Sequence, residues 1–222
     1  MVKYSLIVEN LEKIYKTEVE TIAVRDFNLQ MKEGEITTLA GPSGSGKTTI
    51  LMCIASLLEP TFGKIIVNGK IINTLSLEDL IKYRQNTVGI IFQSYNHIDY
   101  MTIYENIAFP LWLAKKPKKE IKKRVTFLLE NLEISRYAQT YPHFLSAGEQ
   151  QRLAIAVALA NDPQIILADE PTGNLDRSTA DIVVNLLIGE VEEFNKILIL
   201  ATHDEKIIKR SKNVISLQKR AY

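Results

Sequence analysis

Residues 41–48 read Gly41-Pro42-Ser43-Gly44-Ser45-Gly46-Lys47-Thr48 and match the phosphate-binding pattern G-x-x-x-x-G-K-[ST] at every fixed position, which makes them the strongest indication of the fold. The strand-like run 36–40 precedes them, and an apolar helical pattern over 49–58 follows them. The glycines let successive backbone N–H groups turn around a polyphosphate, and a helix N-terminus adds partial positive charge. A Gly/Ser-rich turn before an ordinary helix is the alternative, but the complete pattern favours a nucleoside triphosphate site.

The residues of this loop have separate expected roles. Lys47 is placed to reach the β- and γ-phosphates, and the Thr48 hydroxyl is placed to ligate Mg²⁺. The residues expected to surround the nucleotide are Gly41, Pro42, Ser43, Gly44, Ser45, Gly46, Lys47, Thr48 and Thr49.

Composition narrows the class of protein. The chain has 222 residues, of which 46% are hydrophobic, enough for a normal core. Its 27 Lys and Arg nearly balance 26 Asp and Glu, so the net charge of +1 gives no global field that favours nucleic acid or a membrane surface. The single cysteine, Cys53, cannot form an internal disulfide, and no apolar run approaches the roughly 18 residues that span a bilayer. We expect a soluble, cytoplasmic protein.

Two regions indicate antiparallel β structure. Leu6 to Val8 is a short apolar run, and Phe27, Leu29 and Met31 alternate with polar residues. In the stretch 64–72, Asn68-Gly69 separates two β-branched runs, which is a strong signal for a two-residue hairpin. We expect this hairpin to join the first strands.

Four continuous apolar runs indicate strands that are buried on both faces of a parallel sheet: 88–92, 165–168, 197–201 and 214–217. Between Gln93 and about Asn161 helical patterns dominate instead, including 118–132 and 150–160. The predicted fold is α/β, a P-loop NTPase core with a mostly parallel sheet, an N-terminal antiparallel β subdomain and a helical insertion. We expect one domain over 1–222, with the β subdomain and nucleotide core at about 1–92 and 162–222 and the helical part at about 93–161.

One charge cluster, Lys115 to Arg124, is compatible with contact to anionic lipid or nucleic acid. No aromatic residues interleave with its charges, and an apolar helical stripe follows behind them. A solvated helix face is the favoured interpretation.

Polar side chains follow three of the predicted strands. Asp169 and Glu170 come directly after the run 165–168, at the carboxyl end where open α/β sheets bind ligands. Asp169 suits the Mg²⁺ shell, and Glu170 suits a water that attacks the γ-phosphate. His203 follows the run 197–201 in the same way and is a candidate to contact the γ-phosphate and order that water, although a lone His after a strand is usually structural. The amide oxygen of Gln93, at the start of the helical part, suits Mg²⁺ or the attacking water.

The start of the predicted helix 150–160 is a second place where an anion could bind. Ser146-x-x-Glu149 matches a capping box that opens the helix 150–160, so its N-terminal amides are free for an anion.

Taken with these motifs, the sequence Leu-Ser-Ala-Gly-Glu-Gln-Gln-Arg at 145–152 resembles the signature of the ATP-binding cassette (ABC) ATPases. The phosphate loop, Gln93, the signature, the Asp-Glu strand, Asn174-Leu175-Asp176 and His203 follow one another in the order of that family. The resemblance therefore covers essentially the whole chain.

The resemblance implies ATP and Mg²⁺ as cofactors and a head-to-tail dimer in which each ATP is held between two chains. It implies that the signature of one chain faces the γ-phosphate held by the other, through Leu145, Ser146, Ala147, Gly148 and Glu149. It further implies that Asp176 crosses the same interface and that Tyr15 stacks on adenine.

Two positions depart from the family's usual Leu-Ser-Gly-Gly-Gln, namely Ala147 and Glu149. We expect activity to survive with altered affinity. Asp169 to Asp176, with Tyr141-Pro142-His143 and Tyr104-Glu105-Asn106, resembles the branch that serves lipoprotein-release, macrolide-export and cell-division transporters.

The expected function is that of an ATP-hydrolysing subunit that powers a membrane transporter, peripheral on the inner face of the cell membrane through integral permease subunits. Phe109, Leu111 and Trp112 are candidate permease contacts, although core packing is the alternative for most of them. Two other functions stay open: an ATPase that regulates a membrane partner without transport, and a soluble ABC ATPase acting on nucleic acid or ribosomes. No nucleic-acid partner is expected.

Overall fold

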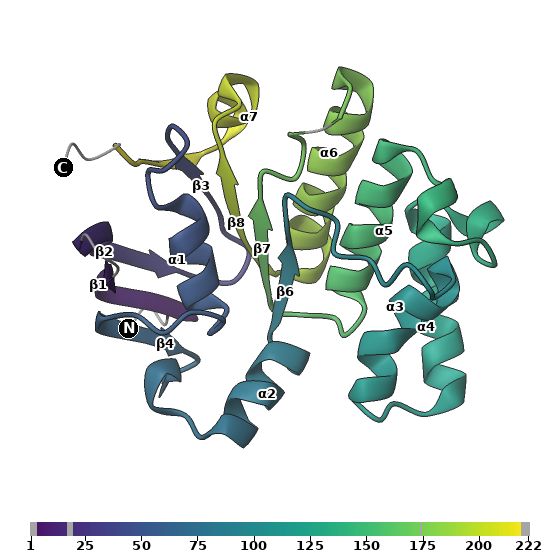
Figure 1. Cartoon of the computed structure of the whole chain (residues 1–222), viewed down its shortest axis with the longest axis horizontal. Coiled ribbons are helices and arrows are strands. Elements are labelled where there is room, and N and C mark those ends of the chain that lie inside the picture. The colour runs from purple at the N-terminus through teal and green to yellow at the C-terminus, as the bar shows by residue number, and fades with distance from the viewer. Residues whose placement is uncertain (1–3, 17–19, 174, 219–222) are drawn as a thin grey trace.

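The computed structural model describes residues 4–16, 20–173 and 175–218, with the side chains of Lys206 and Arg210 left out. Within these residues the strands form two sheets, one antiparallel and one parallel, and the helices lie between and beside them (Figure 1).

The antiparallel sheet has the strand order β2-β1-β4-β5. Its strands are β1 (Leu6–Lys16), β2 (Glu20–Met31), β4 (Phe62–Val67) and β5 (Lys70–Ile71). Asn68 and Gly69 connect β4 to β5 with φ of 50° and 80°, the two positive values that a type I′ turn requires. The predicted hairpin and its junction with the first strands are confirmed, because β4 pairs with β1.

The second sheet is parallel throughout, with the order β6-β7-β8-β3-β9. Its strands are β3 (Ile36–Ala40), β6 (Val88–Ile91), β7 (Ile165–Asp169), β8 (Ile197–Thr202) and β9 (Asn213–Ser216). Each of the four predicted apolar runs forms one of these strands. Because the strands are parallel, their carboxyl ends meet at one edge of the sheet.

The parallel sheet separates two hydrophobic cores. Ile165 and Leu167 of β7 belong to the core shared with the antiparallel sheet, whereas Ile166 and Ala168 belong to the core shared with the helical part. The side chains of a strand alternate between faces, so an unbroken apolar run supplies both cores at once.

The helices α1 (Lys47–Ile54) and α2 (Leu77–Asn86), with the short η1 (Ile72–Thr74), lie on the side of the first core. Cys53 of α1 is buried there, and burial raises the pKa of its thiol to about 11. The sequence patterns did not single out α2, which begins at the capping residue Ser76. On the other face lies α6 (Arg177–Phe194), and α7 (Glu205–Arg210) follows β8.

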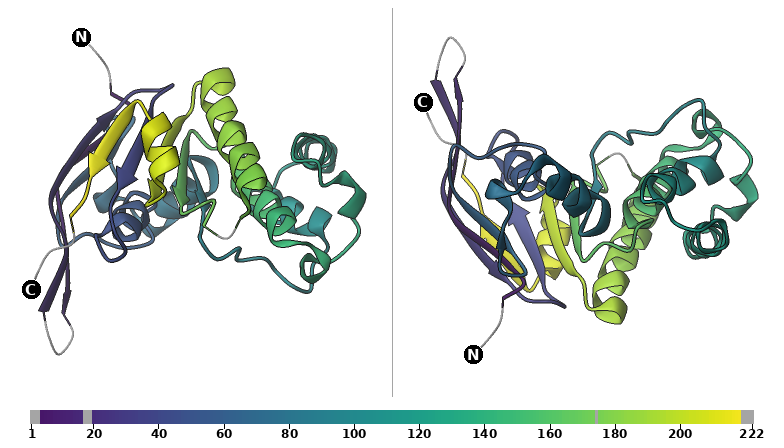
Figure 2. Two further views of the ribbon diagram at one scale, coloured as in Figure 1. Left: turned by 90° about the horizontal axis from the view of Figure 1, so that it is seen from above. Right: turned by 90° about the horizontal axis from the view of Figure 1, so that it is seen from below.

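Residues 92–161 form a group of helices set to one side of the sheets, visible from above and below in Figure 2. It contains α3 (Ile103–Leu113), α4 (Lys118–Asn131) and α5 (Ala147–Leu159), with the short turns η2 (Ser135–Tyr137) and η3 (Pro142–Phe144). The predicted helical insertion is confirmed. α5 begins three residues earlier than expected, because Ser146 is its N-cap.

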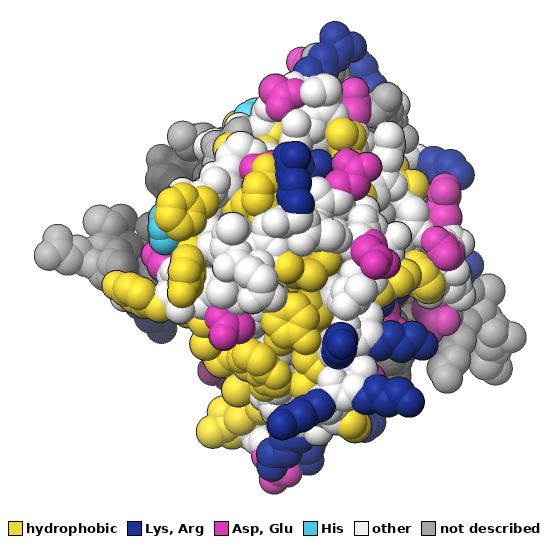
Figure 3. Space-filling view, turned by 90° about the vertical axis from the view of Figure 1, so that its right-hand side faces the viewer, with side chains coloured by type: hydrophobic (Ala, Val, Ile, Leu, Met, Phe, Trp, Pro, Cys, Tyr) yellow, Lys and Arg dark blue, Asp and Glu magenta, His cyan; other side chains and the backbone are white. Residues whose placement is uncertain are grey.

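On α4 the stripe of Ile121, Val125, Leu128 and Leu129 is buried and the lysines of the charge cluster are largely exposed, as the favoured interpretation predicts. Figure 3 shows Lys and Arg side chains beside an apolar area on one side of the molecule. Among the described residues, every helix is too short or too polar to cross a bilayer.

Candidate active site

The phosphate loop joins β3 to α1 and depends on its glycines. Gly44 and Gly46 have φ of 79° and 94°, a left-handed conformation that side chains disfavour. A Cβ on Gly46 would lie 2.5 Å from the Ala23 carbonyl oxygen, and one on Gly41 would lie 2.4 Å from the Leu217 carbonyl oxygen. The loop is therefore wedged between β2 and the chain after β9, with no room for larger residues.

One polar atom inside this loop lacks a hydrogen-bond partner among the described residues. It is the buried Ser45 Oγ. A buried hydroxyl without a partner costs free energy, and a phosphate oxygen bound in the loop is a suitable acceptor. The loop thus fits the triphosphate that its sequence predicts.

Lys47 lies within the loop, with a side chain that is 6% exposed. Its ammonium donates hydrogen bonds to the carbonyl oxygens of Gly41 (2.7 Å) and Pro42 (3.2 Å) and lies 3.6 Å from Glu170 Oε1. The cation is therefore held where the phosphates of a bound nucleotide would lie, paired with weak partners that a phosphate can replace.

Thr48 and Asp169 lie side by side although they are 121 positions apart in the sequence. The Thr48 hydroxyl donates a hydrogen bond of 2.7 Å to Asp169 Oδ2. Burial, together with the charge of Glu170, raises the pKa of Asp169 and outweighs the opposing hydrogen bond from Thr48. A hydroxyl and a carboxylate oxygen side by side are the hard donors that Mg²⁺ prefers, so these residues fit the expected metal.

Glu170 and His203 also meet, as the strand-end argument predicts. Glu170 Oε1 lies 2.8 Å from His203 Nδ1, and Oε2 accepts a hydrogen bond of 3.1 Å from the Thr202 hydroxyl. The backbone N–H of Glu170 donates to the Ala201 carbonyl oxygen. Its φ of 47° is rare outside glycine, and such strained backbone gathers at functional sites. The carboxylate is thus oriented by Thr202 at the end of β8 and by His203 directly after it.

Gln93 is exposed at the end of β6. Its Nε2 lies 4.0 Å from the point where a Cβ on Gly173 would stand, and Glu170 Cβ lies 3.7 Å from that same point. Gln93 therefore borders the loop that carries Glu170, and no hydrogen bond links it to Asp169 or Thr48 among the residues that the structure describes.

Tyr15 lies near the end of β1, 38% exposed, with the Lys13 ammonium 5.5 Å from its ring centre. β1 pairs with β2, whose Ala23 and Val24 contact the phosphate loop at Gly46. This places the aromatic ring on the strand next to the loop, and adenine stacking remains a prediction.

The signature residues lie at the start of α5. Ser146 and Glu149 form the predicted capping box in both directions. The Asp176 side chain caps α6, where it accepts from the backbone N–H groups of Ser178 and Thr179. In the described part of the chain, no hydrogen bond or ion pair links the signature to the phosphate loop. Asn174 lies outside the described residues.

The structure adds two residues that the sequence motifs missed. Thr202 is fully buried and donates a hydrogen bond to Glu170. Its position at the end of a predicted strand, directly before His203, could have identified it. Thr179 donates to Asp176 Oδ2 (2.6 Å), while its methyl group lies 2.8 Å from where a Cβ on Gly148 would stand. It connects the signature to the Asp176 loop within one chain, through a contact that no local pattern shows.

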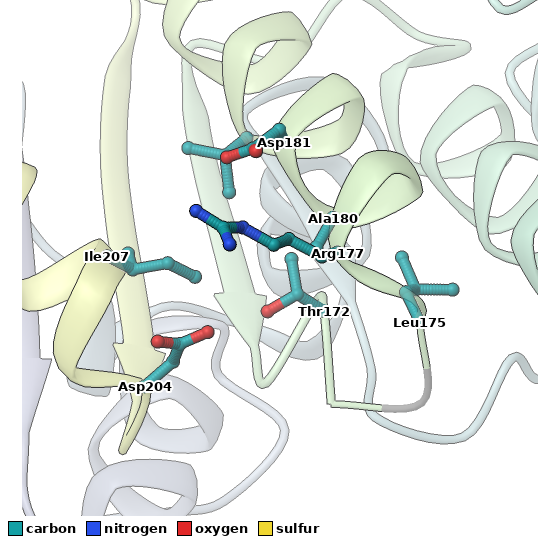
Figure 4. Close-up of a pocket in the computed structure, with 8 residues that line it drawn as sticks. Thr172, Leu175, Arg177, Ala180, Asp181, Asp204 and Ile207 are labelled. Atoms are coloured by element: carbon teal, nitrogen blue, oxygen red, sulfur yellow. The ribbon is translucent and has the colours of Figure 1, made fainter.

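A pocket opens beside the loop after β7, between that loop and the helices α6 and α7 (Figure 4). The Arg177 side chain points into it from α6, and Asp204 lies on the opposite wall. The pocket is lined by Thr172, Leu175, Arg177, Ala180, Asp181, Val184, Asp204 and Ile207. The loop that follows Glu170 therefore forms part of the wall of this pocket, through Thr172 and Leu175.

Comparison with known proteins gives a consistent result. The family model described as ABC transporter matches residues 24–173. A methionine import ATP-binding protein of Bacillus cereus is 42% identical over 203 residues, which are 91% of this chain and 58% of that protein. The chain thus spans little more than half the length of such relatives. The ABC transporter ATP-binding protein MJ1508 of Methanocaldococcus jannaschii is 40% identical over 211 residues, 95% of this chain and 94% of its own length.

Solved structures agree with these relatives. The dimeric structure of MJ0796, a bacterial ABC transporter cassette, superposes with a TM-score of 0.90 at 37% identity, covering 98% of this chain and 100% of that one. A post-hydrolysis dimer of MJ0796 bound to ADP and Pi gives a TM-score of 0.89 at 36% identity, with the same coverage. The cbiO1 protein from Clostridium perfringens, part of the ABC transporter complex cbiONQ, gives 0.85 at 32% identity, covering 97% of this chain and 85% of that one.

Proposed function

Because this chain belongs to the ABC transporter family, we propose that it is the subunit that binds and hydrolyses ATP to drive a membrane transporter. The observation that carries the proposal is the meeting of Lys47, Thr48, Asp169, Glu170 and His203 at the carboxyl ends of β3, β7 and β8. These side chains come from three separate strand ends, and their contacts match the parts that phosphoryl transfer to water needs.

Each side chain of the site has its own role in ATP hydrolysis. Lys47 exchanges its two carbonyl partners for the β- and γ-phosphates. Glu170, held by Thr202 and His203, orients a water for in-line attack and accepts its proton. Gln93 borders the same loop, and its amide oxygen would serve Mg²⁺ or the attacking water and link the nucleotide state to movement of the helical part. Thr48 and Asp169 would hold Mg²⁺, which when bound neutralises charge on the phosphates.

The second half of the site comes from another copy of the chain. The N–H groups of Ala147 and Gly148 open α5 without helical partners, so they are free to bind a γ-phosphate held by the other copy. The similar MJ0796 cassette is dimeric in its solved structures. In this arrangement Asp176 lies at the interface and Tyr15 stacks on adenine. ATP then closes the dimer and hydrolysis opens it.

The membrane partner docks on the helical part and on the segment that carries Gln93. Leu111 is buried and packs in the core, whereas Trp112 and Leu113 at the end of α3 are exposed. Figure 3 shows apolar side chains gathered on this side of the molecule. The chain would act as one domain, at the inner face of the membrane, with the helical part at about 93–161 as the moving section. We place it in the branch with lipoprotein-release, macrolide-export and cell-division transporters.

Two substitutions test the proposal. Glu170→Gln keeps the shape of the side chain but cannot accept the proton, so ATP still binds, turnover falls at least about 100-fold, and Mg-ATP traps a dimer. Lys47→Ala weakens ATP binding itself. Steady-state phosphate release, nucleotide titration and light scattering measure these outcomes, with Lys122→Gln on the exposed face of α4 as control. Normal turnover by a monomeric Glu170→Gln protein would refute the assignment.

A further inference from the structure

The signature of this chain holds a carboxylate close to the helix end that would receive an anion. Glu149 is the third residue of α5, and its side chain is 11% exposed. Its Oε2 accepts hydrogen bonds from the backbone N–H (2.9 Å) and the hydroxyl (2.7 Å) of Ser146. A hydroxyl has one proton, so the Ser146 proton is already used. The free donors at this end are the N–H groups of Ala147 and Gly148.

Glu149 stays charged under ordinary conditions. Burial raises its pKa, but hydrogen bonds from Tyr137, Ser146 and Arg136 together outweigh burial and lower it from 4.5 to about 2. A negative charge in the first turn suits the helix dipole. The same charge repels a phosphate that approaches this helix end, so the signature needs a cation that offsets it.

Arg136 is in position to supply that cation. It lies on η2, between α4 and the signature, and its Nη2 is 3.3 Å from Glu149 Oε1, the oxygen that Ser146 leaves unused. Its guanidinium also stacks 4.6 Å from the ring centre of Tyr137, whose hydroxyl hydrogen-bonds Glu149. The Arg136 side chain is 74% exposed, so the cation lies at the surface beside the signature and not in the core.

We propose that Arg136 is a positioning residue for the signature: by pairing with Glu149, it allows the N-terminus of α5 to accept the γ-phosphate of an ATP held by a second copy of this chain. The inference rests on the proposed function, because it requires the ATP-bound dimer. It also explains how a signature with a carboxylate works where the family's usual residue is a neutral glutamine.

The test measures ATP-dependent dimerisation in the Glu170→Gln background, which holds the dimer closed. We expect Arg136→Gln to raise the dimer dissociation constant about tenfold, the effect of losing one hydrogen bond to a charged group. Arg136→Lys should keep most of the affinity. Sedimentation equilibrium with Mg-ATP gives the constants. Lys122→Gln is the matched control, because Lys122 is an exposed cation with no ion pair among the described residues.

Rescue separates charge compensation from a merely structural role. Glu149→Gln removes the charge while preserving the shape, so adding it to Arg136→Gln should restore dimerisation to within about twofold of Glu149→Gln alone. ATP affinity of the monomer, measured with a fluorescent nucleotide, should be unchanged in every variant, since the phosphate loop is intact. Thermal melting checks that each variant is folded.

The experiment distinguishes failure of the Arg136 inference from failure of the proposed dimer. If Arg136→Gln dimerises as tightly as its parent, or if Glu149→Gln does not restore it, Arg136 does not compensate the signature. If the Glu170→Gln parent binds ATP and stays monomeric, the proposed dimer itself is wrong, and the inference is overturned with it.

Discussion

Among single residues, two neighbouring positions of the signature differ in whether they have room for a methyl group: Ala147 has room and Gly148 does not. The Ala147 side chain is exposed, so the methyl group that departs from the family's usual glycine lies at the surface of the chain. A Cβ on Gly148 would lie 2.8 Å from the Thr179 methyl group. That methyl cannot turn away cheaply, because the Thr179 hydroxyl is bonded to Asp176. Packing against α6 thus explains why glycine is needed at the second position and not at the first.

Gly148→Ala should therefore separate the start of α5 from α6. We expect a loss of about 1–3 kcal/mol in the free energy of unfolding, the usual cost of overpacking, and a weaker ATP-dependent dimer. Thr179→Ser removes the methyl and keeps the hydroxyl, so the double variant should recover. Ala147→Gly serves as the control. Urea unfolding and light scattering measure both effects, and an unimpaired Gly148→Ala protein would show that the contact is unimportant.

At the scale of elements, α3 fixes the segment that leads from β6. Asn106 is buried on α3, and its Oδ1 accepts from the Ile98 N–H (2.8 Å). Its Nδ2 donates to the carbonyl oxygens of Ile98, Met101 and Thr102. One side chain thus bonds one N–H and three carbonyl oxygens between β6 and the first turn of α3. The position of the segment after Gln93 depends on this residue.

Asn106→Ala should cost about 1–3 kcal/mol in the free energy of unfolding, because it removes the partner of the part-buried Ile98 N–H and Met101 carbonyl oxygen. Asn86→Ala is the control: Asn86 is exposed at the end of α2 and its side chain bonds one carbonyl oxygen. We expect that control to cost less than about 0.5 kcal/mol. Chemical denaturation compares the two, and equal costs would contradict the role given to Asn106.

In the molecule as a whole, the two edges of the parallel sheet carry different groups of side chains. The carboxyl edge holds the candidate site. At the amino edge Lys196, 5% exposed, lies 2.7 Å from both Asp162 and Glu190. Arg124 of α4 extends this network, 3.6 Å from Asp162, and its Nη2 donates to the Leu159 carbonyl oxygen (2.6 Å). The network joins the helical part to the core far from the phosphate loop.

Lys196→Met should consequently reduce stability without changing ATP affinity. It leaves the largely buried Glu190 carboxylate unpaired, at a cost of about 3 kcal/mol. Adding Glu190→Gln should recover part of this loss, because the unpaired charge is removed. Thermal unfolding and nucleotide titration provide the two readouts. Impaired ATP binding by a folded Lys196→Met protein would show that the two edges are coupled.

Features that depend on neighbouring residues could be predicted from the amino-acid sequence alone. The phosphate loop, the Asn68-Gly69 turn and the Ser146–Glu149 capping box each follow from the backbone preferences of a few adjacent positions. The apolar runs predicted the buried strands, and the polar residues directly after them predicted the edge where Asp169, Glu170 and His203 gather. The family resemblance supplied the order of these motifs, and the comparisons confirm the family.

Which of these groups contact one another depends on how the strands and helices pack together. β8 lies between β7 and β3, a strand order that no local pattern contains, and that order brings His203 to Glu170 and Thr48 to Asp169. The contacts of Thr179 with Gly148 and of Arg136 with Glu149 likewise join separate elements. Side chains meet across elements through packing of the whole chain, so their pairing is fixed when the two cores form and not by the residues beside them in sequence.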